Sequence, residues 1–301
     1  MNRIEGRRAR WIITAALRLM RLRGMSRLDP FSPVLPRLFP RGVKVRLSSG
    51  AVLRLPMDHQ FWFKIVRRGY QELGTERLLI AGLRPGDKLI DVGAHRGIFT
   101  VIGAQRVGDG GHVYAFEPDP KNMHGLKKAI HINGVTNVTV EGRAVGEVDS
   151  PARFVQTRIG YERLAERPPG AGAWLTAPMV ALETYVRENA IGSVRMLKVD
   201  VDGPELMVLQ GGRQLLEAPE PPLIVMELSR LSEQWRGGYH EARAYLSPYG
   251  YELYGCERTR GHVVPLPSAS ELPWNLTTTT VTLIAVIPSL HRGVVDEGLA
   301  P

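Results

Sequence analysis

The chain has 301 residues, of which 44% are hydrophobic, and its formal net charge is +9. This length and apolar content suit one large α/β domain with extensions, or two small domains, and argue against global disorder. The single cysteine, Cys256, excludes an intramolecular disulfide and a multi-cysteine metal cluster.

The positive charge is concentrated at the N-terminus. Residues 1–46 contain twelve Lys and Arg and two acidic residues, so the rest of the chain carries a net charge of −1. Residues 11–28 place apolar side chains on one side of a helical wheel and most arginines on the other. Such a basic amphipathic helix can lie on an anionic membrane surface, and packing against the domain or a partner is the alternative. We expect a cytoplasmic protein and hypothesise a peripheral membrane contact through residues 1–28.

The next segment is rich in proline. Prolines between residues 30 and 40 argue against a helix, and alternating apolar residues predict a hairpin that turns at residues 48–50. We therefore expect residues 29–69 to be a linker with a small β element. The main domain is expected at residues 70–288, and a tail at residues 289–301.

Within the main domain, helical and strand patterns alternate. The expected order is helix 70–82, strand 88–92, helix 98–107, strand 112–117, helix 120–133, strand 137–145, strand 196–202, helix 204–217 and strand 222–228. Two last strands, at 250–257 and 277–287, are expected to form an antiparallel pair. The alternation is typical of a mostly parallel sheet with helices on both faces. Residues 146–180 interrupt it, and we expect an irregular substrate loop with a short strand around 152–156.

A glycine-rich turn follows the first strand of this domain. Asp91 ends the strand, Gly93 allows a tight turn, and Gly97 is expected to let the following helix pack close to the strand. The N-terminus of that helix then faces the carboxyl edge of the sheet, where ligands bind in open α/β folds. Glu117 ends the second strand, where a carboxylate can accept hydrogen bonds from both ribose hydroxyls. Together these features favour a ligand of the adenosine type.

A dinucleotide suits this turn less well than S-adenosylmethionine does. The spacing lacks the G-x-G-x-x-G pattern, and the carboxylate of Asp91 would repel a diphosphate. The same carboxylate would attract the ammonium group of a methionine moiety, directly or through water. S-adenosylmethionine is therefore the expected cofactor, and an NAD(P)-dependent oxidoreductase is the alternative.

Three segments resemble the FkbM family of methyltransferases. They are DVGAHRGIFT (91–100), VYAFEPDPKNMHGLKKAIHIN (113–133), and LKVDVDGPELMVLQGGRQLL (197–216) with IVMEL (224–228). The resemblance covers residues 70–228. It implies a Rossmann-like class I methyltransferase fold, with helices on both faces of a seven-stranded, mostly parallel sheet whose last strand is antiparallel. It also implies S-adenosylmethionine as cofactor and O-methylation of a sugar, glycan or natural product.

The resemblance also implies site residues. The expected cofactor-binding residues are Asp91, Gly93, Ala94, His95 and Gly97 in the first motif, Glu117 at the ribose, Arg143 and Ala144 around the adenine, and Asp200 after the fourth strand. The chain departs from the family at two positions. His95 stands where Asn is common, and Asp202 stands where the longer Glu is common.

Methyl transfer to a hydroxyl needs aligned reactants and a base, because the pKa of a hydroxyl is far above 7. Asp200 is the first candidate for the base or for the group that orients the acceptor, and Asp202 and His95 are further catalytic candidates. Lys198 is placed to pair with one of the acids. Asp200, Asp202 and Glu205 would be the ligands of a divalent cation, but oxygen ligands alone are a weak signal, so we expect no metal.

Two further functions remain as alternatives. An RNA methyltransferase would use the basic N-terminal arm, but the Asn-Pro-Pro-aromatic signature of base-amine methylation is absent. A membrane-attached scaffold would not bind the cofactor, and the intact Gly93, Gly97 and Glu117 argue against it. The favoured substrate is therefore a hydroxylated small molecule or glycan rather than nucleic acid, and the oligomeric state stays open.

Overall fold

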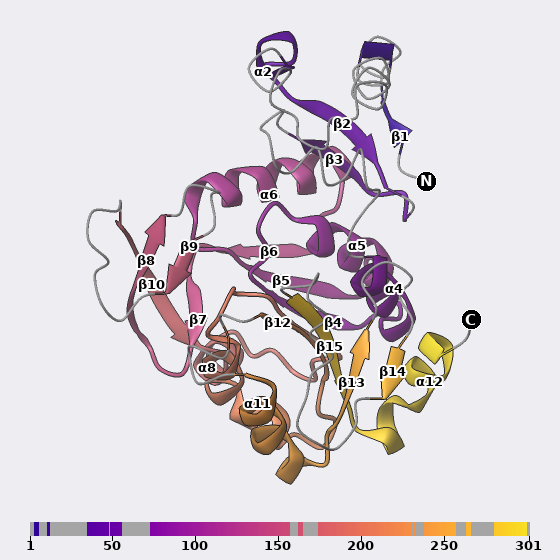
Figure 1. Cartoon of the computed structure of the whole chain (residues 1–301), viewed down its shortest axis with the longest axis vertical. Helices are drawn as coiled ribbons and strands as arrows, with labels where there is room; N and C mark the ends of the chain where they lie inside the picture. The colour runs from indigo at the N-terminus through magenta and orange to yellow at the C-terminus, as the bar shows by residue number, and fades with distance from the viewer. Residues whose placement is uncertain are drawn as a thin grey trace, which may run out of the picture.

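The computed structural model describes residues 3–5, 11–12, 35–47, 49–55, 73–156, 162–164, 174–229, 232, 238–256, 263–265 and 280–299. The structural statements below concern these residues, which form three β-sheets and several helices (Figure 1). None of the described helices is long and apolar enough to cross a membrane.

The largest sheet confirms the expected fold. Its strands, in the order of pairing, are β14 (Val263–Pro265), β13 (Glu252–Cys256), β15 (Thr280–Val286), β12 (Leu223–Ser229), β11 (Met196–Val199), β4 (Lys88–Val92), β5 (His112–Phe116) and β6 (Val138–Glu141). From β6 to β12 the neighbouring strands are parallel, whereas β15 is antiparallel to both of its neighbours. Seven strands with one reversed make the Rossmann-like class I methyltransferase sheet, and β14 adds a short eighth strand at its edge.

Helices cover both faces of this sheet (Figure 1). They are α4 (Leu73–Gly82), α5 (Ile98–Val107), α6 (Pro120–Asn133), α7 (Leu182–Glu188), α8 (Glu205–Gln210), α9 (Arg213–Leu216), α11 (Tyr239–Leu246), the 3-10 helix η1 (Ser247–Tyr249) and α12 (Pro288–Leu299). Successive side chains of a strand point to opposite faces, so Leu89 and Ile90 of β4 join different apolar layers. The layer around Leu89 includes α4, α5 and α12, and the layer around Ile90 includes α7, α8, α9 and α11. Residues 288–299, within and next to the expected C-terminal tail, form α12, whose Val294 packs in the layer around Leu89.

Within the expected loop at residues 146–180, the described residues form strands of a second sheet. Its order is β7 (Ala144–Gly146), β10 (Trp174–Ala181), β8 (Ser150–Gln156) and β9 (Glu162–Leu164). The short strand expected around 152–156 lies within β8. The strand predicted over 137–145 is therefore two strands, β6 and β7, in different sheets. The helix predicted over 204–217 is likewise divided into α8 and α9. The break lies where a Cβ on Gly211 would be 1.9 Å from the carbonyl oxygen of Gly146, so β7 passes against the helix there.

A third, antiparallel sheet lies at the N-terminal end of the chain. It consists of β1 (Arg3–Ile4), β2 (Val43–Arg46) and β3 (Val52–Leu55), and the β2–β3 hairpin turns where it was expected. Residues 3–4 are thus strand, and of the expected basic helix only residues 11–12 are described, in helical conformation. A helical turn, α2 (Leu35–Leu38), also occurs in the proline-rich segment, because a proline is tolerated in the first turn of a helix.

The hairpin shares the core of the main domain. Val45 and Leu53 are buried in the same apolar layer as Leu89 and Val101. The boundary expected at residue 70 therefore does not separate two hydrophobic cores.

Candidate cofactor site and active site

The turn after β4 requires a glycine at position 93. Gly93 has φ of 78°, and a Cβ there would lie 1.9 Å from the carbonyl oxygen of Asp200. The N–H groups of Gly93 and Ala94 donate to the carbonyl oxygen of Phe116, at 3.1 and 2.9 Å. The turn is thus held between the carboxyl ends of β5 and β11, and the Ala94 side chain packs into a small apolar cluster with Leu126.

Gly97 has a different role from the one expected. A Cβ at Gly97 would lie 2.6 Å from Cδ1 of Leu126, so this glycine allows α5 to approach α6 rather than the strand. The close approach of α5 to β4 depends on Gly103, where a Cβ would lie 2.4 Å from Cδ2 of Leu89. The only signal for Gly103 in the sequence is a glycine inside a strong helical pattern, which by itself does not identify the partner.

Glu117 is held at the end of β5 by two backbone groups. Its Oε2 accepts from the N–H of His95 at 2.7 Å, and its Oε1 accepts from the N–H of Asp119 at 2.9 Å. Burial raises the pKa of Glu117 to about 7, although these two hydrogen bonds act in the opposite direction. The Asn122 side chain also hydrogen-bonds this carboxylate, which has four lone pairs, so Glu117 can still accept a bond from a ribose hydroxyl. His95, with φ of 50°, contributes its backbone to this arrangement.

A buried lysine connects the two expected acids. Lys198 and Asp91 are register partners on neighbouring strands, and Lys198 Nζ lies 3.1 Å from Asp91 Oδ1 and 3.4 Å from Asp200 Oδ2. Nζ also donates to the carbonyl oxygen of Gly93 at 3.2 Å, and Thr100 Oγ1 donates to Asp91 Oδ2 at 2.6 Å. The side chain of Asp91 is 0% exposed and that of Asp200 is 29% exposed. Of the two carboxylates, Asp200 is therefore the one that a ligand can reach.

The acids that follow Asp200 lie in different environments. Asp202 is half-buried with φ of 55°, and it does not cap α8, because the N-cap residue is Pro204. Glu205 is 1% exposed, and its Oε1 accepts from the N–H of Gly203 at 2.9 Å. Burial raises the pKa of Glu205 to about 7, and the charge of Asp200 adds to this shift. Glu205 is thus a buried neighbour of Asp200.

The expected adenine-framing residues lie beside a polar cluster. Arg143 Nε donates to Glu141 Oε2 at 3.1 Å, and the guanidinium carbon lies 4.9 Å from the centre of the Tyr185 ring. The Tyr185 hydroxyl donates to Glu141 Oε1 at 3.0 Å, and burial raises the pKa of this phenol, so it remains protonated. The Ala144 side chain packs into the second sheet. Sequence patterns missed Glu141 and Tyr185, because α7 follows the second sheet in the chain and meets β6 only in the fold.

Metal coordination has no clear ligand set in the described part of the chain. No group of three or more His, Cys, Asp or Glu side chains is arranged there to hold an ion.

Comparisons with known proteins point to one family. The model of the Methyltransferase FkbM domain matches residues 91–253. The 31-O-demethyl-FK506 methyltransferase FkbM of Streptomyces tacrolimicus is 26% identical over an alignment of length 185, which covers 47% of this chain and 66% of that protein. The protein-L-isoaspartate O-methyltransferase of Ignicoccus hospitalis is 38% identical over 142 residues, which are 46% of this chain and 58% of that protein. The chain therefore spans less than two thirds of the length of these relatives.

The solved structures that resemble this chain are distant in sequence. An rRNA methylase from Streptococcus thermophilus has a TM-score of 0.42 and 11% identity, over 70% of this chain and 92% of that chain. A SAM-dependent methyltransferase from Aquifex aeolicus has a TM-score of 0.40 and 13% identity, over 75% of this chain and 93% of that chain.

Proposed function

Because the chain belongs to the FkbM methyltransferase family, we propose that it transfers a methyl group from S-adenosylmethionine to a hydroxyl oxygen of a sugar, glycan or other natural product. The observation that carries this proposal is the position of Asp200. This carboxylate is partly exposed at the carboxyl edge of the sheet, next to the Gly93 turn, and it is paired with a buried cation. Such a group can both orient a hydroxyl and take its proton.

The residues around the Gly93 turn fit the proposed cofactor. Glu117 retains acceptor capacity for a ribose hydroxyl, and the tight turn at Gly93 holds the backbone close to Asp200. Arg143, Glu141 and Tyr185 form a polar and aromatic cluster at the end of β6, where we expect the adenine to lie. The bound cofactor supplies an electrophilic methyl group on a sulfonium. The partly exposed carboxylate nearby is that of Asp200, whereas the charge of Asp91 is already balanced by Lys198.

In the proposed reaction, Asp200 would orient the acceptor hydroxyl and take its proton, while a bound cofactor would supply the methyl group and lose it from sulfur to become a thioether. Lys198 Nζ, 3.4 Å from Asp200 Oδ2, holds this carboxylate in place through an ion pair. Glu205 has a pKa of about 7 and is protonated in about half of the molecules at neutral pH. A free carboxylate acceptor would need no base and would be repelled by Asp200, so the arrangement favours a hydroxyl acceptor.

The proposal is tested first by cofactor binding. Isothermal calorimetry with S-adenosylhomocysteine, with and without magnesium, should show saturable binding to the folded protein, and NADH should not bind. Transfer of labelled methyl from S-adenosylmethionine should then be followed over a panel of hydroxylated sugars and polyketides, with an RNA pool as the competing acceptor class. Binding of NADH alone would favour the oxidoreductase alternative, and transfer only to RNA would replace the proposed substrate class.

Cofactor affinity should depend on pH through Glu117. Ribose hydroxyls donate to the ionised carboxylate, so protonation below a pKa of about 7 opposes binding. The dissociation constant of S-adenosylhomocysteine is expected to be about tenfold larger at pH 6 than at pH 8. Calorimetry on Glu117→Gln should show weaker binding with little pH dependence. An unchanged pH dependence in that variant would mean that Glu117 does not contact the ribose.

A further inference from the structure

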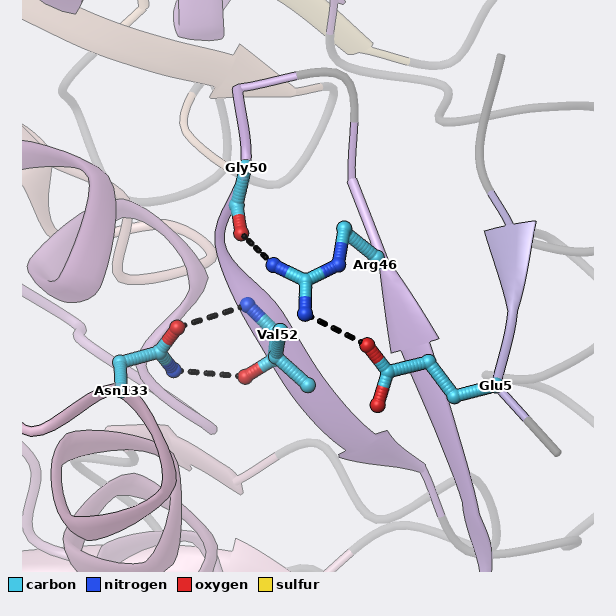
Figure 2. Close-up of polar contacts among 5 residues, drawn as sticks. All are labelled: Glu5, Arg46, Gly50, Val52 and Asn133. Carbon is cyan, nitrogen blue, oxygen red and sulfur yellow. Dashed lines mark hydrogen bonds and ion pairs between the residues drawn. The ribbon is translucent and has the colours of Figure 1, made fainter.

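The side chain of Asn133 links the N-terminal sheet to α6 by two hydrogen bonds, in addition to the apolar core that they share (Figure 2). Asn133, at the end of α6, accepts from the N–H of Val52 through Oδ1 at 2.7 Å and donates to the carbonyl oxygen of Val52 through Nδ2 at 2.6 Å. These are the two bonds that a neighbouring strand would make with the edge strand β3. Arg46 in turn bonds Glu5, at 2.7 Å, and the carbonyl oxygen of Gly50, at 3.1 Å, so β1 is tied to the hairpin.

This arrangement gathers cations from two distant parts of the sequence. Residues 35–55 and 120–137 contain eight Lys and Arg and no Asp or Glu. Most of these cations are exposed, namely Arg37, Arg41, Arg46, Lys121, Lys127 and Lys128, and Lys44 and Arg54 are half-buried. In Figure 1 the N-terminal sheet, α2 and α6 lie together at the upper end of the molecule, away from α11. α6 thus adds exposed cations to the end of the molecule that carries the N-terminal sheet.

The described parts of the N-terminal segment also expose large apolar side chains. Trp11 is 73% exposed, the highest value among the large hydrophobic residues that the structure describes, and Leu38 is 49% exposed. Tryptophan and leucine beside Lys and Arg are typical of protein surfaces that lie in the interface of an anionic bilayer. A nucleic acid would use the cations but would leave the exposed Leu38 without a partner.

We propose that this basic surface, defined by Trp11, Arg37, Leu38, Arg41, Lys127 and Lys128, binds peripherally to an anionic lipid bilayer. The cations attract acidic headgroups, and the apolar side chains enter the boundary between headgroups and acyl chains. Each Lys or Arg at such a surface increases partitioning about fivefold at low salt. The surface is separate from the proposed methyl-transfer site, so its binding does not depend on the catalytic proposal.

Cosedimentation of the full chain with vesicles tests this inference. Vesicles of phosphatidylcholine mixed with phosphatidylglycerol should bind the protein, vesicles of phosphatidylcholine alone should bind it weakly, and high salt should release it. The double variant Lys127→Glu/Lys128→Glu should lower partitioning at least about tenfold, and Trp11→Ala should lower it further. The matched control is Arg187→Glu/Arg243→Glu, which changes the net charge equally on α7 and α11 and should bind as the wild type does.

The outcomes separate the surface from general charge effects. Equal losses in the α6 variant and in the control would overturn the inference, because net charge alone would then explain binding. Binding to an RNA pool without binding to anionic vesicles would overturn it in favour of a nucleic-acid surface. S-adenosylhomocysteine affinity is measured in every variant. Lost vesicle binding with unchanged cofactor affinity supports a separate membrane surface.

Discussion

Lys198→Met is expected to lower the free energy of unfolding by about 3–5 kcal/mol. The substitution keeps the length of the side chain but removes the cation that Asp91 Oδ1 and Asp200 Oδ2 share. Asp91 is 0% exposed and would remain as a buried carboxylate with only the Thr100 hydroxyl to stabilise it. Urea denaturation followed by circular dichroism measures the loss.

The matched variant for this test is the double substitution Asp91→Asn/Lys198→Met. It removes the buried charge together with its partner, so most of the lost stability should return. The double variant also isolates Asp200 from its cation while the fold is kept. If Lys198→Met were as stable as the wild type, the buried ion pair would not be a determinant of the fold.

Asp200→Asn is expected to reduce kcat by a factor of about 10²–10⁴. The amide has the shape of the carboxylate but cannot accept the proton of the acceptor hydroxyl. Asp200 approaches the Gly93 turn through its carbonyl oxygen, which the substitution keeps, so the affinity for S-adenosylhomocysteine should stay close to that of the wild type. Steady-state methyl transfer and calorimetry on the same sample measure both quantities.

Asp202→Asn serves as the comparison, because Asp202 lies two residues further on in a half-buried position with left-handed backbone. Its effect on kcat should be clearly smaller. A larger loss in Asp202→Asn than in Asp200→Asn would reassign the base. Loss of cofactor binding in Asp200→Asn would show that this carboxylate holds the cofactor rather than the acceptor.

The sequence by itself determined the order of the elements and the class of the fold. Local periodicity, together with glycine and proline at the ends of elements, predicts the strands at 88–92 and 112–116 and the helices at 98–107 and 120–133. Gly93 was also identified correctly, because a tight turn after a strand demands a residue with positive φ. These elements and this turn depend on residues that are adjacent in the chain, so they can be predicted from a single sequence.

Tertiary structure decided how the site residues are paired. Asp91 looked like a ligand-facing acid, but its partner Lys198 lies on another strand and buries it. Gly97 allows α5 to pack against α6 rather than against the preceding strand. The helix expected over 204–217 is interrupted near Gly211, where β7 lies against it. The contact between α6 and the N-terminal sheet through Asn133 could not be predicted from the sequence either, because Val52 and Asn133 are 81 positions apart. Burial and charge pairing arise between distant segments, and only their arrangement in space decides them.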